Sequence, residues 1–243
     1  VFERNGAAAE EGSFANGGIA SAGYAAPWAS PGVVKHVLAH LWKKDTPLRF
    51  CNPSMSELRW LWQWQKASKL PTFIRNREHI LRLAEYSSSR IQTLSESLHL
   101  EHERNKGLMV LLRSDREASL MQASLKVLSD AGLSFKTLNP EEARCIEPAL
   151  APETNLSQAI LFPDDEIGNC RQFALLIKNE AEALGTKFHF NTPIEPLSGA
   201  EPRTIRLSKN DRGEKFDALV ICAGLDSAAI VRGLGLRIPL IGI

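Results

Sequence analysis

The sequence predicts a mixed α/β protein with both α/β and α+β character. From about residue 157 onward, strand-like and helix-like segments alternate, which is typical of a parallel sheet with crossover helices. The apolar run from Ala218 to Cys222 ends at Ala223-Gly224, as expected of a buried parallel strand that ends beside a ligand. A glycine-rich stretch, Ser13 to Gly32, comes shortly after a predicted strand end at Val1 to Arg4.

Length and composition are those of an ordinary globular protein. The 243 residues suffice for one large domain or two small ones, with 44% hydrophobic and 23% charged residues. The net charge of +1 gives no reason to expect a nucleic-acid partner. No charge occurs from Gly12 through Val34, a run long enough to span a bilayer, but 11 of its 23 residues are Gly, Pro, Ser or Asn. The run is therefore predicted to be a loop.

The four cysteines bear on metal binding and on the cellular compartment. Cys51, Cys145, Cys170 and Cys222 are far apart and form no CxxC pair, so neither zinc nor iron–sulfur ligation is indicated. The chain opens on a strand end, without the basic start and apolar run of an export signal. Reduced thiols and a cytoplasmic location are therefore expected.

Periodicity and capping patterns predict the remaining elements in order. Helices are expected over Val33–Trp42 after Ser30-Pro31, from Ser54 and Glu57 to before Pro71, over Ile80–Leu98, from Ser114 and Glu117 to Gly132, after Asn139-Pro140, and over Cys170–Leu184 before Gly185. Strands are expected at Leu108–Leu112, Phe135–Leu138, Ala159–Phe162, Lys187–Phe190, Arg203–Ser208 and Phe216–Cys222. Turns are expected at Asn105–Gly107, Asp164–Glu166 and Asn210–Gly213.

The stretch from Ser13 to Gly32 is the first candidate binding segment. It contains four glycines and two prolines, and Asn16-Gly17-Gly18 suits a loop whose amides lie against a flat or anionic ligand. A mobile linker is the alternative. Glu3 stands just before it at the strand end, where the acid of a dinucleotide-binding βαβ unit hydrogen-bonds the adenosine ribose; an exposed strand-end glutamate is the alternative here.

Several segments together resemble one enzyme family. They are SFANGG from Ser13, GYAAPWASPG from Gly23, RLAEYS from Arg82, EPAL from Glu147 and PDDEIGNC from Pro163. In this order they resemble the D-amino acid dehydrogenase (small subunit) family, within the D-amino acid oxidase-like FAD-dependent oxidoreductases. The likeness runs from Val1 to about Pro239. The GxGxxG loop and the C-terminal substrate-binding strands of the family have no counterpart here, so an internal fragment that is inactive by itself is expected.

The resemblance implies a division into two domains. A glutathione-reductase-like FAD-binding domain, an incomplete Rossmann fold, would consist of residues 1–32 and 168–243. A substrate domain of antiparallel sheet and helices would consist of residues 33–167. This discontinuous arrangement follows from the resemblance alone.

The resemblance also implies which residues bind FAD. Glu3 would accept hydrogen bonds from the adenosine ribose, with Arg4 near the adenine, although a solvated arginine is equally consistent. The segment that would cross the flavin and its ribityl-phosphate arm comprises Ser13, Ala15, Asn16, Gly17, Gly18 and Ile19. Ile194 would meet the adenine through its backbone, and Ala223 and Gly224 would approach the cofactor; plain strand-end turns are the alternative for these three. No catalytic residue is assigned.

Two aromatic residues are candidates for the substrate side of the flavin. Tyr24 and Trp28 would form a pocket wall, or else pack in a core. His36 and His40 have the i,i+4 spacing of a helical metal pair, but no glutamate lies between them. Lys35 and Lys43 lie nearby and would repel a cation, so no metal site is predicted.

The implied function is oxidative deamination of a small D-amino acid to a 2-oxo acid and ammonia, with electrons passed through FAD to a quinone of the respiratory chain. The protein would be cytoplasmic, or peripheral on the cytoplasmic membrane. A sibling amine oxidoreductase acting on D-hydroxyproline, glycine or sarcosine is one alternative, and a truncated non-catalytic paralogue is another. Substrate preference stays open because Lys106, Leu108, Ile167 and Asn169 depart from the family pattern.

Overall fold

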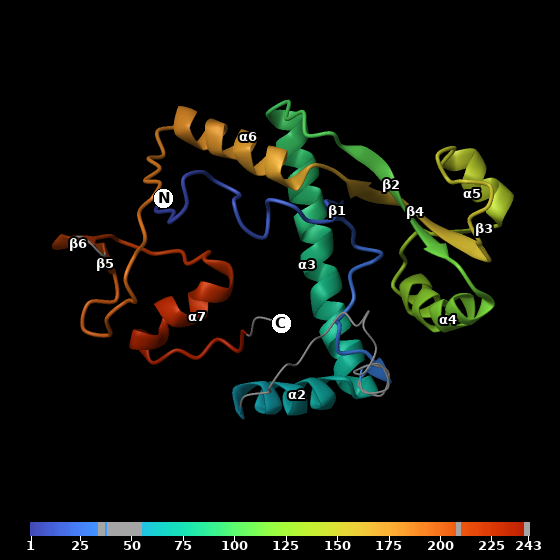
Figure 1. The fold of residues 1–243 in the computed structure, drawn as a ribbon, viewed down its shortest axis with the longest axis horizontal. Helices are drawn as coiled ribbons and strands as arrows, with labels where there is room; N and C mark the ends of the chain where they lie inside the picture. Colours follow the sequence, from blue (N-terminus) through green and yellow to red (C-terminus); the bar gives the residue numbers. More distant parts are fainter. Residues whose placement is uncertain (34–36, 38–54, 208–209, 241–243) are drawn as a thin grey trace. The chain divides into compact units, whose positions relative to one another are not determined.

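The computed structural model describes residues 1–33, 37, 55–207 and 210–240 (Figure 1). These residues fall into two compact units. Unit 1 comprises Val1–Ala15, Trp28–Arg75 and Ala174–Ile243, and unit 2 comprises Asn16–Pro27 and Asn76–Phe173. The division into an FAD-binding and a substrate domain stays a prediction, because compactness does not assign a ligand to either unit.

Unit 2 is built on an antiparallel sheet around β4 (Gln158–Ile167). One edge of β4 pairs along its length with β2 (Asn105–Leu112). The other edge pairs near its start with β3 (Lys136–Leu138) and at its end with β1 (Ile19–Ala20). The prediction of a mixed α/β fold with antiparallel sheet and helices is confirmed.

Two helices supply the caps that the sequence predicted. In α4 (Asp115–Asp130), the Ser114 side chain accepts from the Glu117 N–H, and Gly132 after the helix has a φ of +78°. In α5 (Pro140–Ile146), Asn139 and Glu142 form a reciprocal capping box. These bonds satisfy backbone donors that would otherwise be unpaired at each helix start.

The core of unit 2 lies between the sheet and these helices. One cluster of buried side chains consists of Leu112, Leu125, Leu128, Ile160 and Phe162. A second cluster consists of Leu138, Ala143, Leu156 and Ala159. Ile160 and Phe162 are almost completely buried, so β4 contributes the central side chains of the unit 2 core.

Two of the described helices lie between β1 and β2 in the chain. The first is α2 (Met55–Ala67), which ends before Pro71 as predicted. Pro71 lies in the first turn of α3 (Leu70–Ser97), where its missing N–H costs no intrahelical bond. The predicted amphipathic helix over Ile80–Leu98 is thus the C-terminal part of a longer one. Of the helices that the structure describes, none is long and apolar enough to cross a membrane.

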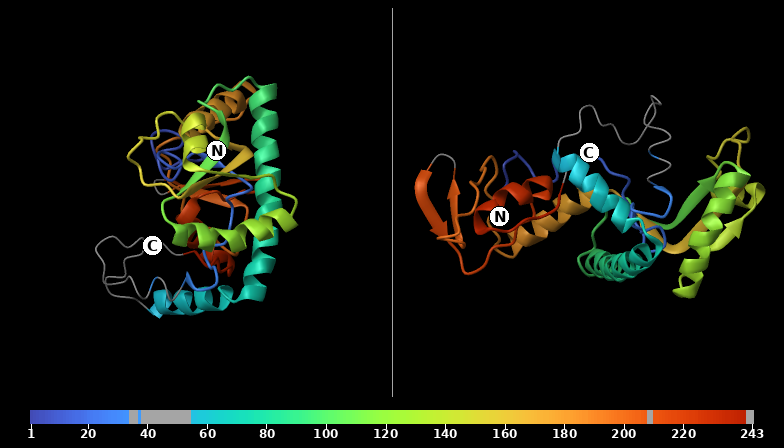
Figure 2. Two further views of the ribbon diagram at one scale, coloured as in Figure 1. Left: turned by 90° about the vertical axis from the view of Figure 1, so that its right-hand side faces the viewer. Right: turned by 90° about the horizontal axis from the view of Figure 1, so that it is seen from below.

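Unit 1 contains short paired segments and small helices. Phe2 pairs in parallel with His189, which lies beyond the end of α6 (Cys170–Ala183). An antiparallel pair, β5 (Thr204–Leu207) and β6 (Asn210–Lys215), is visible as a two-stranded ribbon in Figure 2. Three short helices follow, namely η1 (Gly224–Asp226), α7 (Ser227–Ile230) and η2 (Arg232–Leu234).

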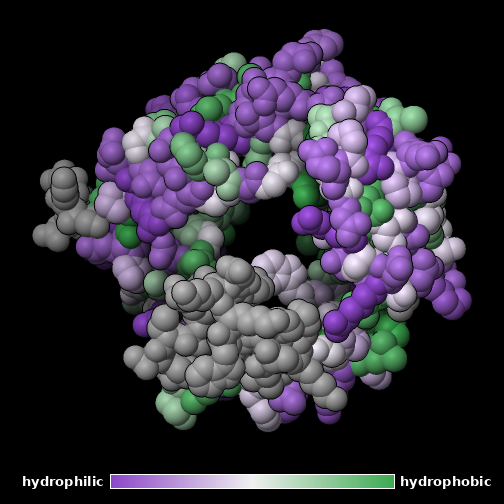
Figure 3. Space-filling model, turned by 45° about the vertical axis from the view of Figure 1, so that its right-hand side comes forward, coloured by the Kyte–Doolittle hydropathy of each residue, from purple (hydrophilic) through white to green (hydrophobic). Residues whose placement is uncertain are grey.

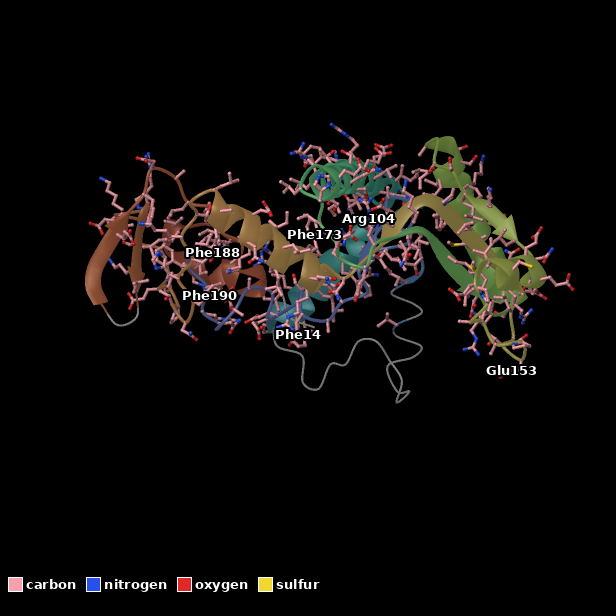
Figure 4. The ribbon with its side chains drawn as sticks, turned by 90° about the horizontal axis from the view of Figure 1, so that it is seen from above. Phe14, Arg104, Glu153, Phe173, Phe188 and Phe190 are labelled. Atoms are coloured by element: carbon pink, nitrogen blue, oxygen red, sulfur yellow. The ribbon has the colours of Figure 1, made fainter. Side chains whose placement is uncertain are left out.

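Aromatic rings and a lysine connect α6 to the segment that follows it. Phe188 and Phe190 lie next to each other in Figure 4, with ring centroids 6.0 Å apart. Lys178 of α6 places its ammonium 5.8 Å and 5.9 Å from the two ring centroids. Asn169 caps α6 through its side chain, which accepts from the Gln172 N–H. Gly185 after the helix has a φ of +92°, as expected for the predicted helix stop.

Three predicted turns lie in strands instead. Asn105–Gly107 is the start of β2, with a register shift between Lys106 and Leu108 and a φ of +92° at Gly107. Asp164–Glu166 belongs to β4, and Asn210–Gly213 belongs to β6. Each segment contains or faces a register irregularity. Ladder pairs are formed at Lys106, Glu166 and Asn210, and pairing there outweighs the local turn preference.

Two predicted strands are shorter or missing. Lys187–Phe190 contributes a single bridge at His189. The segment Phe216–Cys222 is not a strand, and Val220 within it is 86% exposed. No other described segment forms a ladder with it, and an apolar run becomes a buried strand only where neighbours pair with it.

On the face shown in Figure 3, hydrophobic residues lie as separate patches among hydrophilic ones.

Candidate functional site

Glu3 lies at the end of a paired segment in unit 1. The His189 N–H donates to the Val1 carbonyl (2.8 Å), and the Glu3 N–H donates to the His189 carbonyl (2.9 Å). One carboxylate oxygen of Glu3, Oε1, accepts from the Asn5 N–H at 2.8 Å. Within the described chain, Oε2 accepts no hydrogen bond, so Glu3 can accept from another donor.

Ile194 belongs to a segment that runs beside Glu3. The Thr192 N–H donates to the Glu3 carbonyl (2.8 Å), and the Asn191 N–H donates to the Asn5 carbonyl (2.9 Å). Ile194 itself forms an antiparallel bridge with Leu207 and is half-buried. The structure therefore brings the backbone before Ile194 next to the acidic strand end.

Arg4 connects this strand end to the turn at Ala223-Gly224. Its guanidinium binds Glu11 through Nε (2.9 Å) and Nη2, and binds the Asp226 carboxylate through Nη1. Asp226 ends η1, and its N–H donates to the Ala223 carbonyl (3.0 Å). The predicted residues Glu3, Arg4, Ala223 and Gly224 are thus connected within unit 1.

Hydrogen bonds and neighbouring charges shift the pKa values of Arg4 and Glu11 so that each group favours its ionised form. The hydrogen bond to Glu11, followed by the attraction of Asp226, raises the pKa of Arg4 above its ordinary value. The bonds from Arg4 and Asn5 hold the pKa of Glu11 below its ordinary value. Because these groups are solvent-exposed, the pairs orient the side chains more than they stabilise the fold.

Close packing requires a glycine at position 18, within the glycine-rich stretch. The Gly18 carbonyl accepts from the Gly168 N–H at 2.8 Å, and its own N–H donates to Asn16 Oδ1 at 2.8 Å. Its φ is +60°, and a Cβ at this position would lie 2.0 Å from the Gly168 carbonyl oxygen. At Gly17, by contrast, a Cβ would meet only Ile19, at an ordinary distance of 3.4 Å.

The end of β4 holds the loop in unit 2. Ile19 and Ala20 pair with Ile167 and Glu166, directly beside the contact between Gly18 and Gly168. The predicted loop residues are divided between the units: Ser13 and Ala15 belong to unit 1, whereas Asn16, Gly17, Gly18 and Ile19 belong to unit 2. Their common role in binding stays a prediction.

Tyr24 and Trp28 are both exposed, at 51% and 77%. Tyr24 belongs to unit 2 and Trp28 to unit 1. Neither side chain therefore packs in a core of the described chain. Their role as a pocket wall stays a prediction.

The structure identifies two anchoring residues that the sequence reasoning did not single out. Buried Asp165 accepts from Ser21 Oγ and from the backbone of Ala22. Buried His102 contacts Ser95 Oγ through Nε2 (3.0 Å), and its carbonyl accepts from the Asn169 N–H (2.8 Å). Nothing local distinguishes Asp165 from its acidic neighbours Asp164 and Glu166, and nothing local distinguishes His102.

Metal ligation gains no support from the described residues. No group of three or more His, Cys, Asp or Glu side chains there could hold a metal ion. Cys145, Cys170 and Cys222 are free thiols. Cys51, His36 and His40 lie outside the described residues, as does most of the predicted helix after Pro31.

Solved structures with a similar fold include two oxidases and a deaminase. Glycine oxidase from Geobacillus kaustophilus has a TM-score of 0.62 and 17% identity, over 97% of this chain and 51% of that one. An L-amino acid deaminase from Proteus vulgaris lacking its specific insertion has a TM-score of 0.59 and 11% identity, over 97% and 49%. Iminodiacetate oxidase from Chelativorans sp. BNC1 has a TM-score of 0.55 and 18% identity, over 93% and 49%.

At these identities the likeness shows the fold. The chain spans about half the length of each of these proteins. The family described as "DAO: FAD dependent oxidoreductase" matches residues 1–242, which is nearly the whole chain. The chain belongs to the DAO family of FAD-dependent oxidoreductases.

Proposed function

We propose that the full-length protein catalyses the FAD-dependent oxidative deamination of small D-amino acids to 2-oxo acids and ammonia. Electrons would pass to a quinone, and the protein would work in the cytoplasm or at the surface of the cytoplasmic membrane. Family membership supports oxidoreductase chemistry with FAD. The D-amino acid and quinone assignments rest on the resemblance of the segments around Ser13, Gly23 and Pro163.

The observation that carries the proposal is the strand end at Glu3. Glu3 comes directly after Phe2, which pairs in parallel with His189. The Oε2 atom of Glu3 accepts no hydrogen bond from the described chain. A carboxylate at this place in a nucleotide-binding sheet can accept from ribose hydroxyls through charge-assisted bonds. The residues present therefore fit the adenosine end of FAD.

The glycine-rich loop fits the flavin end. Gly17 is exposed, and a side chain there would meet only Ile19, so the backbone can be approached closely from outside. Gly18 is held against Gly168, which makes the path of the loop definite. A backbone fixed in this way provides oriented peptide dipoles without reorganisation when the cofactor binds.

FAD, when bound, accepts a hydride from the Cα–H of an amino acid whose amine is neutral, and water hydrolyses the resulting imine to the 2-oxo acid and ammonia. The task of the chain is to hold the cofactor and to orient the substrate, so positioning supplies much of the rate. Tyr24 and Trp28 would offer apolar ring surface to the substrate, which favours small neutral amino acids such as D-alanine.

The test is anaerobic mixing of the full-length holoenzyme with each alanine enantiomer while the visible flavin absorption is recorded. Bleaching by D-alanine, together with reduction of a quinone analogue, is expected, because only one enantiomer can aim its Cα–H at the flavin. Bleaching by L-alanine but not D-alanine would overturn the proposal. Bleaching only by sarcosine, glycine or D-hydroxyproline would establish the sibling activity instead. A full-length protein that binds no FAD would be a non-catalytic paralogue.

A further inference from the structure

Asp165 of β4 is a buried carboxylate whose hydrogen-bond donors all come from one short turn. The side chain belongs to a residue that is only 6% exposed. Its Oδ2 accepts from Ser21 Oγ, and its Oδ1 accepts from the backbone N–H groups of Ala22 (3.0 Å) and Gly23 (3.4 Å). The turn is extended by the Tyr24 N–H, which donates to Ser21 Oγ at 2.7 Å.

No cation within the described chain balances this charge. The nearby guanidinium of Arg104 pairs instead with Glu166, the next residue of β4, at 3.7 Å. A buried carboxylate without a cation depends on its hydrogen bonds for stabilisation. The negative charge of Asp165 is therefore stabilised mainly when the turn Ser21–Tyr24 adopts this conformation.

Steric contact fixes the same turn against β4. A Cβ on Gly23 would lie 2.5 Å from Phe162 Cδ1 and 3.0 Å from Asp165 Oδ2. Phe162 is a core residue of unit 2 and is 1% exposed, so displacing its ring would disrupt core packing and cost free energy. The backbone before Tyr24 is thus held against β4 by close packing on Phe162 and by the Asp165 hydrogen bonds.

The result is a fixed backbone that presents an exposed ring. Tyr24 has its N–H bonded within the turn, while its side chain is 51% exposed. We infer that Asp165 is a positioning residue that holds the turn Ser21–Tyr24 so that the Tyr24 ring faces the amino acid substrate. This inference rests on the proposed function, in which Tyr24 walls the substrate pocket.

The first experiment measures the turn directly in the full-length holoenzyme. Asp165→Asn and Ser21→Ala each remove part of the hydrogen-bond set, and Asp164→Asn is the matched control because Asp164 is the exposed neighbour on β4. Hydrogen exchange of the amides of residues 22–24 should accelerate by about tenfold or more in the first two variants, as expected for lost bonds to a charged group. The control should leave it unchanged. Unchanged exchange in both variants would overturn the inference.

The second experiment asks whether the turn acts through Tyr24. KM for D-alanine should rise by roughly tenfold in Asp165→Asn with a smaller change in kcat. Tyr24→Ala should raise KM as well, and the double variant should be no worse than the worse single one, because both changes remove the same contact. Additive effects on KM, or faster exchange with unchanged KM, would contradict the inference.

The experiments distinguish a failure of the proposed D-amino acid oxidation from a failure of the proposed role of Asp165. If D-alanine does not bleach the wild-type flavin, the proposed function is wrong, and KM is then measured with whichever amine does. The exchange experiment needs no substrate, so it tests the role of Asp165 in either case. Ser21→Ala, at a half-buried position, keeps the test valid if Asp165→Asn fails to fold.

Discussion

Gly18→Ala tests whether the contact between Gly18 and Gly168 determines the path of the loop. The added Cβ would lie 2.0 Å from the Gly168 carbonyl oxygen, well inside the 3.0 Å below which such contacts are essentially never seen. The φ of +60° also disfavours any residue with a Cβ. The backbone must therefore move away from Gly168 and lose the bond between the Gly168 N–H and the Gly18 carbonyl.

The expected cost combines the backbone conformation and the lost bond. The left-handed conformation costs about 1–2 kcal/mol and a lost neutral hydrogen bond about 0.5–1.5 kcal/mol, so unit 2 should lose roughly 2–3 kcal/mol of unfolding free energy. Gly17→Ala is the matched control, since its Cβ meets only Ile19 at 3.4 Å and its φ is not positive. This control should change stability by less than about 0.5 kcal/mol.

The assay is urea unfolding of the full-length apoprotein, with FAD affinity measured by fluorescence titration. Gly18→Ala should lower the urea midpoint without changing the slope, and should weaken FAD binding because the loop leaves its place on β4. Gly17→Ala should resemble the wild type in the urea midpoint. If the two variants behave alike in both measurements, the reasoning from the Gly168 contact is wrong.

Three further predictions concern the acidic strand end and one helix cap. Glu3→Ala should weaken FAD binding by at least roughly tenfold, because hydrogen bonds to charged groups contribute about 1.5–3 kcal/mol each; unchanged affinity in fluorescence titration would mean that the ribose site lies elsewhere. The pKa of Glu11 is lower in the folded protein than its ordinary value of 4.5. The ionised Glu11 carboxylate therefore contributes its full stabilisation above pH 4.5, and this stabilisation is lost as the pH falls through the folded-state pKa. Arg4→Ala should therefore reduce this acid-dependent loss in pH-dependent unfolding. Ser114→Ala should cost about 1 kcal/mol in urea unfolding, since it removes the acceptor of the Glu117 N–H.

Local sequence signals were sufficient where the interaction partners are close in the chain. The capping pair Ser114 with Glu117 and the helix start at Asn139-Pro140 form as predicted, because each depends on residues within one helical turn. The helix stop at Gly185 needs only one residue with positive φ. The ordered series of family-like segments likewise identified the FAD-dependent oxidoreductase family from sequence, and the match over residues 1–242 confirms it.

Strand boundaries were beyond such reasoning. Asp164–Glu166 has the composition of a turn yet lies in β4, where Glu166 pairs with Lys106 of β2 and Ala20 of β1 from distant parts of the chain. Ala218–Cys222 has the composition of a buried strand yet pairs with no described segment. A strand is stabilised by its neighbours rather than by its own sequence, so composition alone cannot decide where it ends.

The same reason separates the candidate site into what the sequence determined and what tertiary structure decided. The sequence predicts Glu3 and the Asn16–Gly18 loop as candidate binding residues, since this prediction needs only residue type and order. Only the structure distinguishes Gly18, which touches Gly168, from Gly17, which does not. Only the structure shows that Asp165 holds the turn at Ser21, a residue 144 positions earlier in the chain. Contacts over such separations depend on how β4 packs, and no local pattern encodes them.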